Sequence, residues 1–114
     1  MRSWAAPTLR FLGLGAGLLT FGLALHAGPA ASGAALFKQK CTMCHGADGK
    51  GFAALKTPDF TSTRWQSSLK DKGLAEVIKN GKKGTMMPLF GDQLKDDEIQ
   101  PLIGYVRTFA GKKK

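Results

Sequence analysis

The stretch Cys41-Thr42-Met43-Cys44-His45 contains both cysteines of the chain and one of its two histidines. Two thiols three residues apart, followed at once by a histidine, are typical of covalent c-type haem attachment. Residues three apart lie on one face of a helical turn, so both sulfurs can reach the two neighbouring vinyl groups of one haem. The next residue then presents its imidazole to the iron from the proximal side. We therefore predict that Cys41 and Cys44 bind haem covalently and that His45 is the proximal iron ligand.

Other interpretations of this stretch fit the sequence less well. A structural zinc site needs about four ligands, and the motif supplies three. The remaining histidine, His26, lies in a segment that is predicted to be removed. A thioredoxin-like redox pair would need strands alternating with helices, and no such pattern is visible. A structural disulfide across so short a loop is less favoured still. The sequence therefore favours haem over zinc, redox-pair and disulfide chemistry.

The N-terminal 30 residues have the composition of a secretory signal peptide. Arg2 and Arg10 make the first part basic, residues 11–25 carry no charge, and small residues follow up to Ala30. This order is typical of signal peptides, and cleavage after Ala27 or after Ala30 fits equally well. The apolar run of 15 residues is shorter than the roughly 20 residues that span a bilayer. We predict export to the periplasm, with an uncleaved membrane anchor as the alternative.

Two adjacent methionines mark a second candidate site. Met86 and Met87 are the only methionines after the haem motif, and Pro88 follows them directly. A thioether is a soft ligand that suits haem iron, and a methionine opposite a histidine raises the reduction potential. The residue before a proline is biased towards an extended backbone, which favours a rigid loop here. The alternative is that both methionines fill gaps in the core.

Trp65 is a further candidate contact to the cofactor. It follows a stretch, residues 52–63, in which no helical or strand period is visible. A buried indole N–H usually finds a hydrogen-bond partner, and a haem propionate would be one. An ordinary core aromatic explains Trp65 equally well.

Apolar spacing predicts an all-α fold of a few short helices. Residues 33–41 place Gly33, Phe37 and Cys41 on one face. A second helix is expected within residues 67–80, and a third within residues 92–109, where Pro101 is an awkward fit because it lacks a backbone donor. Asp71 and Asp96 are the predicted N-caps of these two helices. The predicted apolar stripes are Leu74, Val77 and Ile78 in the second helix, and Ile99, Leu102, Ile103, Val106 and Phe109 in the third.

Taken together, these features resemble the class I cytochrome c family, in its small bacterial mono-haem form. The resemblance covers roughly residues 33–109 and rests on four segments of this sequence. They are Cys41-Thr-Met-Cys44-His45, the following Gly46-Ala-Asp-Gly-Lys-Gly51, Met87-Pro88, and Leu102-Ile-Gly-Tyr-Val-Arg107. The resemblance implies that the first and last helices cross, with Gly33 and Phe37 meeting Tyr105. It also implies that Met87, before the proline, is the distal iron ligand, with Met86 as its rival.

On this basis residues 31–111 are expected to form a cytochrome c domain around one haem c, with residues 112–114 as a basic tail. The resemblance implies single-electron transfer between Fe(II) and Fe(III), and no enzymatic reaction. Two other functions remain: a haem subunit of a larger periplasmic dehydrogenase complex, and a haem-based ligand sensor with an open sixth iron position. We also expect the apoprotein to be largely unfolded, because so small a domain buries a marginal core without its cofactor.

Charge suggests the partners of such a protein. The whole chain has a net charge of +9, and without Arg2 and Arg10 the remaining 15 basic and 8 acidic residues give +7. Such a surface favours redox proteins with acidic surfaces, and association with an anionic membrane surface is a further expectation. Nucleic acid is not an expected partner. Lysines near the exposed haem edge would steer docking, and the candidates are Lys50, Lys82 and Lys83.

Overall fold

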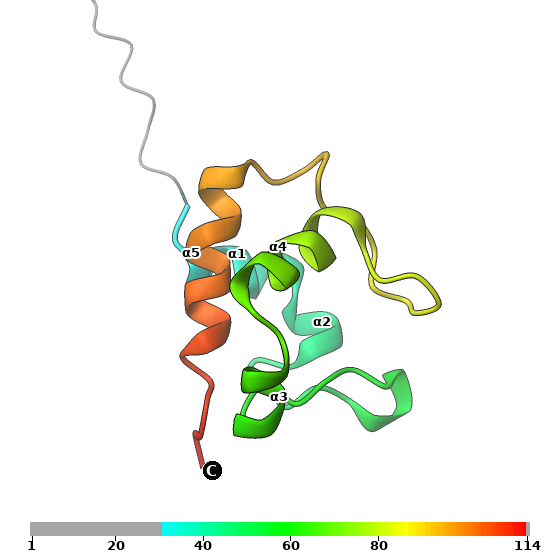
Figure 1. Cartoon of the computed structure of the whole chain (residues 1–114), viewed down its shortest axis with the longest axis vertical. Coiled ribbons are helices and arrows are strands. Elements are labelled where there is room, and N and C mark those ends of the chain that lie inside the picture. Colours follow the sequence, from blue (N-terminus) through cyan, green and yellow to red (C-terminus); the bar gives the residue numbers. More distant parts are fainter. Residues whose placement is uncertain (1–30, 114) are drawn as a thin grey trace, which may run out of the picture.

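The computed structural model describes residues 31–113, which fold into helices joined by loops, and no strand occurs among them (Figure 1). The predicted all-α fold is therefore confirmed. The predicted signal peptide, its cleavage positions and the alternative anchor lie outside the described residues. No helix within residues 31–113 has the length and apolarity to cross a membrane. The helical segments are α1 (Gly33–Lys40), α2 (Thr42–His45), the 3-10 turn η1 (Ala53–Leu55), α3 (Thr63–Ser68), α4 (Asp71–Asn80) and α5 (Asp96–Arg107).

The first and last helices, α1 and α5, cross in close contact, as the resemblance implied (Figure 1). A Cβ atom on Gly33 would overlap the backbone carbonyl of Pro101, so only glycine permits this approach. Four residues further along α1, the ring of Phe37 lies 5.3 Å from that of Tyr105 between centroids. The Ser32 hydroxyl caps α1 by accepting a hydrogen bond from the Ala35 N–H at 3.2 Å. This crossing fixes the direction in which α1 leads into the Cys41–His45 turn.

The apolar face of α5 forms the centre of the core. Four residues of the predicted stripe are buried in α5, the fifth, Phe109, is buried just beyond its end, and Ile99 is completely inaccessible to solvent. Within α4, Leu74 is buried, whereas Val77 and Ile78 are half-buried. The buried apolar residues come from α1, α4, α5 and the segments between and after them: Leu36, Phe37, Phe60, Leu74, Leu94, Ile99, Leu102, Ile103, Val106 and Phe109. One continuous core therefore joins α1, α4 and α5.

The starts of α4 and α5 differ from the prediction by one residue. Lys70 and Lys95, not Asp71 and Asp96, occupy the N-cap positions. Each aspartate is instead the first helical residue, where its charge still complements the positive end of the helix dipole. The Lys95 N–H donates to the Glu98 carboxylate at 2.9 Å, which satisfies one backbone group at the start of α5. Helix α5 also continues through Pro101, so the predicted conflict there does not end the helix.

Candidate haem site

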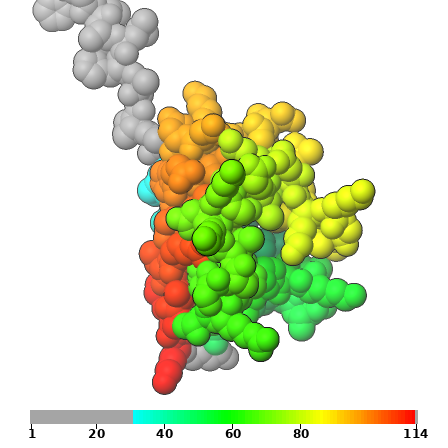
Figure 2. All heavy atoms as spheres, viewed as in Figure 1, coloured from blue at the N-terminus to red at the C-terminus, as the bar shows by residue number. Residues whose placement is uncertain are grey.

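A cavity of about 400 Å³ opens between α2, α3, α4, α5 and the loop that follows α4. Its walls are mainly apolar, and its lining includes Cys41, Cys44, His45 and Met87. Figure 2 shows two segments that project from the same side of the body, one around residues 52–57 in green and one around residues 82–87 in yellow. Both segments contribute lining residues. The structure thus brings the haem motif and the distant methionines to a single cavity.

The motif itself forms one helical turn, α2. The N–H groups of Cys44 and His45 both donate to the Cys41 carbonyl, at 3.2 and 2.9 Å. Both thiols are half-buried, and burial raises the pKa of Cys41 to about 11, so that thiol is neutral. No cluster of three or more metal-binding side chains (His, Cys, Asp or Glu) occurs within residues 31–113.

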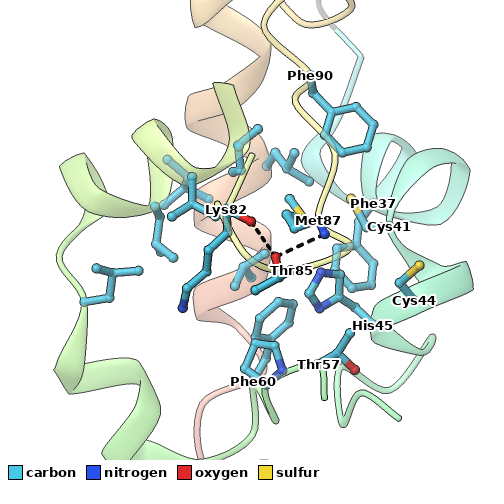
Figure 3. A pocket seen from close by; sticks show the side chains of 18 of the residues that line it. Phe37, Cys41, Cys44, His45, Thr57, Phe60, Lys82, Thr85, Met87 and Phe90 are labelled. Atoms are coloured by element: carbon cyan, nitrogen blue, oxygen red, sulfur yellow. Dashed lines mark hydrogen bonds between the residues drawn. The ribbon is translucent and has the colours of Figure 1, made fainter. Parts of the chain in front are cut away.

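The imidazole of His45 points into the cavity and stacks on the ring of Phe60 (Figure 3). Their centroids are 4.6 Å apart and the planes differ by 19°. Burial lowers the pKa of His45, which favours the neutral form that binds metals. Its Nδ1 atom is buried and finds no hydrogen-bond partner among the described residues. Buried polar atoms are normally paired, so a neutral, partly unpaired imidazole facing an apolar cavity fits an iron-bearing haem.

The segment after α4, residues 81–90, is hereafter the distal loop. It holds Met87 through three hydrogen bonds, two of them drawn in Figure 3. The Met87 N–H donates to the Thr85 hydroxyl at 3.2 Å, and that hydroxyl donates to the Lys82 carbonyl at 2.7 Å. The Lys82 N–H donates to the Met87 carbonyl at 3.3 Å. Gly81 has φ +72°, and a Cβ there would come within 2.8 Å of the same carbonyl, so glycine is required for the loop to close.

The two methionines differ in exposure. Met87 is half-buried, whereas the side chain of Met86 is 77% exposed. Both reach the cavity lining. The assignment of Met87 as the distal ligand remains a prediction, and its burial is the property that distinguishes it from Met86.

Trp65 lies in α3, half-buried, with its ring 4.7 Å from that of Phe60 between centroids. It lines the cavity, so it is near the expected cofactor, while its contact to a propionate remains a prediction. Phe60 itself was not identified from the sequence as a site residue. It lies in the aperiodic segment 52–63, where no local pattern marks a buried position, and its stacking on His45 depends on contacts between distant parts of the chain.

The lysines are distributed differently from the prediction. Lys82 lines the cavity as expected, and Lys56, which was not predicted, does so too. Lys50 instead lies in a separate surface groove with Lys112 and Lys113. The glycine-rich loop after His45 packs against Phe109, beyond the end of α5, and the Gly49 carbonyl accepts a hydrogen bond from the Phe60 N–H at 2.7 Å.

Comparison with known proteins places this geometry in a family. The family model described as cytochrome c oxidase, cbb3-type, subunit III matches residues 28–106. The cbb3-type cytochrome c oxidase subunit FixP of Bradyrhizobium sp. (strain ORS 278) is 33% identical over 84 residues, covering 74% of this chain and 29% of FixP. The dihydro-heme d1 dehydrogenase of Pseudomonas aeruginosa is 37% identical over 98 residues, covering 86% of this chain and 19% of that enzyme. The chain therefore spans less than a third of either relative.

Solved structures agree with this assignment. The KustC0563 c-type cytochrome is 31% identical, with a TM-score of 0.66, and the match covers 70% of this chain and 99% of that one. Cytochrome cL from Hyphomicrobium denitrificans is also 31% identical, with a TM-score of 0.55, over 66% of this chain and 44% of that one. The chain belongs to the family described as cytochrome c oxidase, cbb3-type, subunit III, and it has the all-α fold of c-type cytochromes, which carry covalently bound haem c.

Proposed function

We propose that Cys41 and Cys44 would hold one haem c through thioether bonds and that His45 and Met87 would supply its two iron ligands. The observation that carries this proposal is the convergence of all four side chains on one apolar cavity. The motif and the methionine are more than 40 positions apart in the sequence, so only the fold brings them together. When bound, the haem supplies an iron that alternates between Fe(II) and Fe(III).

The protein's own residues have separate tasks in this proposal. His45 binds through a neutral imidazole, which its burial favours. Met87 supplies a soft thioether, which stabilises the reduced iron and raises the potential. The apolar walls exclude water, which also favours the less charged reduced state. Two protein ligands leave no open iron position, so electron transfer is supported over ligand sensing and over a reaction at the iron.

The partners we propose are redox proteins with acidic surfaces. Lys56 and Lys82 lie at the cavity, and the neighbouring Lys83 is exposed. Their positive charge would steer an acidic partner towards the haem edge. The predicted signal peptide supports a periplasmic location, with the uncleaved anchor as the alternative.

A second candidate is a permanent haem subunit of a larger complex. The observation that favours it is that relatives include cbb3-type oxidase subunits and a dihydro-heme d1 dehydrogenase. Size-exclusion chromatography of the native protein separates the two candidates. A free carrier elutes as a small monomer, whereas a subunit co-elutes with its complex.

The ligand assignment is tested by visible absorption spectra of the exported protein, oxidised and then reduced with dithionite. Sharp low-spin reduced bands are expected, together with a weak far-red iron–thioether band in the oxidised protein. Met87→Ala should abolish the far-red band, and the matched control Met86→Ala should retain it. Loss of the band in Met86→Ala alone would reassign the ligand. A high-spin wild-type spectrum that shifts with carbon monoxide would refute the closed site and favour the sensor.

A further inference from the structure

Arg107, at the end of α5, has an unusually complete set of hydrogen bonds. Its Nη1 atom donates to the backbone carbonyl of Gln66 at 2.7 Å and to the Gln66 side-chain oxygen at 2.8 Å. Its Nη2 atom donates to the Leu69 carbonyl at 2.6 Å, and its Nε donates to the Asp71 carboxylate at 2.9 Å. The planar guanidinium can serve these acceptors at once because its donors have a fixed, forked geometry. The C-terminal end of α3 is thereby attached to α5.

The Gln66 side chain extends this attachment to a second segment. Its oxygen accepts from Arg107, so its nitrogen is left to donate, and it does so twice. The acceptors are the Phe60 carbonyl at 2.7 Å and the Val106 carbonyl at 3.0 Å. Gln66 therefore connects the segment before α3 to the last turn of α5, and every polar atom of its side chain is used.

The residues held in this way form one wall of the cavity. Phe60, Trp65 and Leu69, hereafter the proximal wall, all line it. Phe60 is the residue that stacks on His45, and Trp65 packs on Phe60. None of the three reaches α5 through a hydrogen bond of its own side chain, since Phe60 and Leu69 have none to offer. Gln66 and Arg107 bind the backbone carbonyls of Phe60 and Leu69, which lie at the two ends of the segment that carries the wall.

We propose that Arg107 and Gln66 are positioning residues for the haem iron, because they hold the proximal wall closed and fix the ring of Phe60 against His45. This inference rests on the proposed function. If the wall loosens, the His45 ring can rotate and water can enter beside the haem. Water stabilises the more highly charged oxidised iron, so the reduction potential falls. The ring plane of an axial imidazole also affects the electron paramagnetic resonance of the oxidised iron.

The test uses the haem-loaded protein and the variant Arg107→Lys. Lysine keeps the positive charge and can still pair with Asp71, but its single ammonium cannot serve the Gln66 and Leu69 carbonyls together. We expect a lowered midpoint potential and shifted g-values, with the far-red iron–thioether band retained. Asp71→Asn is the matched control, because it weakens only the exposed ion pair and leaves the carbonyl bonds intact. It should leave both the potential and the g-values unchanged.

Gln66→Ala is the second variant. It tests the positioning role on its own if Arg107→Lys does not accumulate with haem. It removes the bonds to Phe60 and Val106 but leaves those of Arg107 to Leu69 and Asp71. It should shift the g-values in the same direction as Arg107→Lys. The double variant should shift them little further than the larger single effect, because the two residues act in one network.

A destabilised reference separates positioning from simple stability. Ile99→Ala removes buried volume from α5 at a residue that does not line the cavity. It should lower the melting temperature without moving the potential or the g-values. If Arg107→Lys and Gln66→Ala behave like Ile99→Ala, the positioning role is refuted while the proposed function stands. A wild type without covalent haem or without the far-red band would refute the proposed function, and this inference with it.

Discussion

The proximal wall and the distal loop face the same cavity but are attached to the molecule in different ways. The hydrogen bonds of Gln66 and Arg107 connect the wall to α5. The aromatic ring of Phe60, which belongs to the wall, is buried. In the distal loop, by contrast, the hydrogen bonds of residues 82–89 are all made within the loop itself, as far as the described chain shows. The loop is joined to α4 at its end, where the Phe90 N–H donates to the Ile78 carbonyl at 2.9 Å.

This difference indicates which iron ligand is the more easily lost. Segments with few buried apolar contacts and exposed hydrogen bonds open at a lower free-energy cost than core helices. The side chains of Met86 and Leu89 are 77% and 52% exposed, so the distal loop has this character. We infer that opening of the loop would release Met87, the proposed distal ligand, while His45, the proposed proximal ligand, stays in place.

The largest expected effect comes from preventing covalent attachment of the haem in the cavity that both sides line. In Cys41→Ser/Cys44→Ser, expressed in the same host, we expect most of the helical circular dichroism to disappear. The reason is that an apolar cavity of about 400 Å³ would face water in a domain whose core is already small. The wild-type protein is the control. A double variant that keeps its helical signal and melts cooperatively would show that the fold does not depend on covalent haem.

A smaller loss of stability is expected from a change at the crossing of α1 and α5, since α5 is the helix to which the proximal wall is attached. Gly33→Ala should destabilise the protein by about 2 kcal/mol, because its Cβ would overlap the Pro101 carbonyl and force the helices apart. Gly104→Ala is the control, since a Cβ there meets no atom within 4 Å, and alanine is the better helix former. Urea unfolding measures both. Equal stability of the two variants would contradict the close packing of the crossing.

Weakening the distal loop should have a local effect. Thr85→Val keeps the shape of the side chain but removes its bonds to Lys82 and Met87. We expect the far-red iron–thioether band to be lost at a lower urea concentration, equivalent to about 1 kcal/mol, while global unfolding changes little. Thr61→Val, outside the loop, is the comparison variant. Parallel shifts of both transitions would show that the loop does not open independently.

The smallest expected effect concerns the lysines. Lys56→Glu and Lys82→Glu should each slow electron transfer with an acidic redox protein several-fold at low salt, because they reverse charge at the cavity. Lys50→Glu should slow it less, since Lys50 lies in another groove. Stopped-flow rates at low and high ionic strength measure the difference. Equal slowing by all three variants would mean that total charge, not position, controls the encounter.

Local patterns in the sequence predicted much of this molecule. The stripe of α5 repeats at helical spacing, so its buried face was predicted residue by residue. The haem motif is equally local, because its chemistry requires a fixed spacing. The N-caps were wrong by one residue, because each helix begins at the aspartate itself, where the carboxylate still lies at the positive end of the helix dipole.

Features that depend on long-range contacts were not predictable in the same way. Phe60 meets His45 through contacts between distant parts of the chain, among them its packing on Phe37 and Phe109. The side of the molecule on which Lys50 lies is set by the fold of the glycine-rich loop. The sequence left two methionines as rivals, and their difference in exposure emerged only from the shape of the distal loop.

The exposure of Met86 affects the order in which the methionines are oxidised by peroxides. Peroxides convert methionine to its sulfoxide, which is polar and a poor substitute for a thioether at iron, and they act first where sulfur is accessible. Met43 and Met86 are 87% and 77% exposed, whereas Met87 is half-buried. Oxidant is therefore expected to react with Met43 and Met86 before it reacts with Met87, the sulfur proposed to bind the iron.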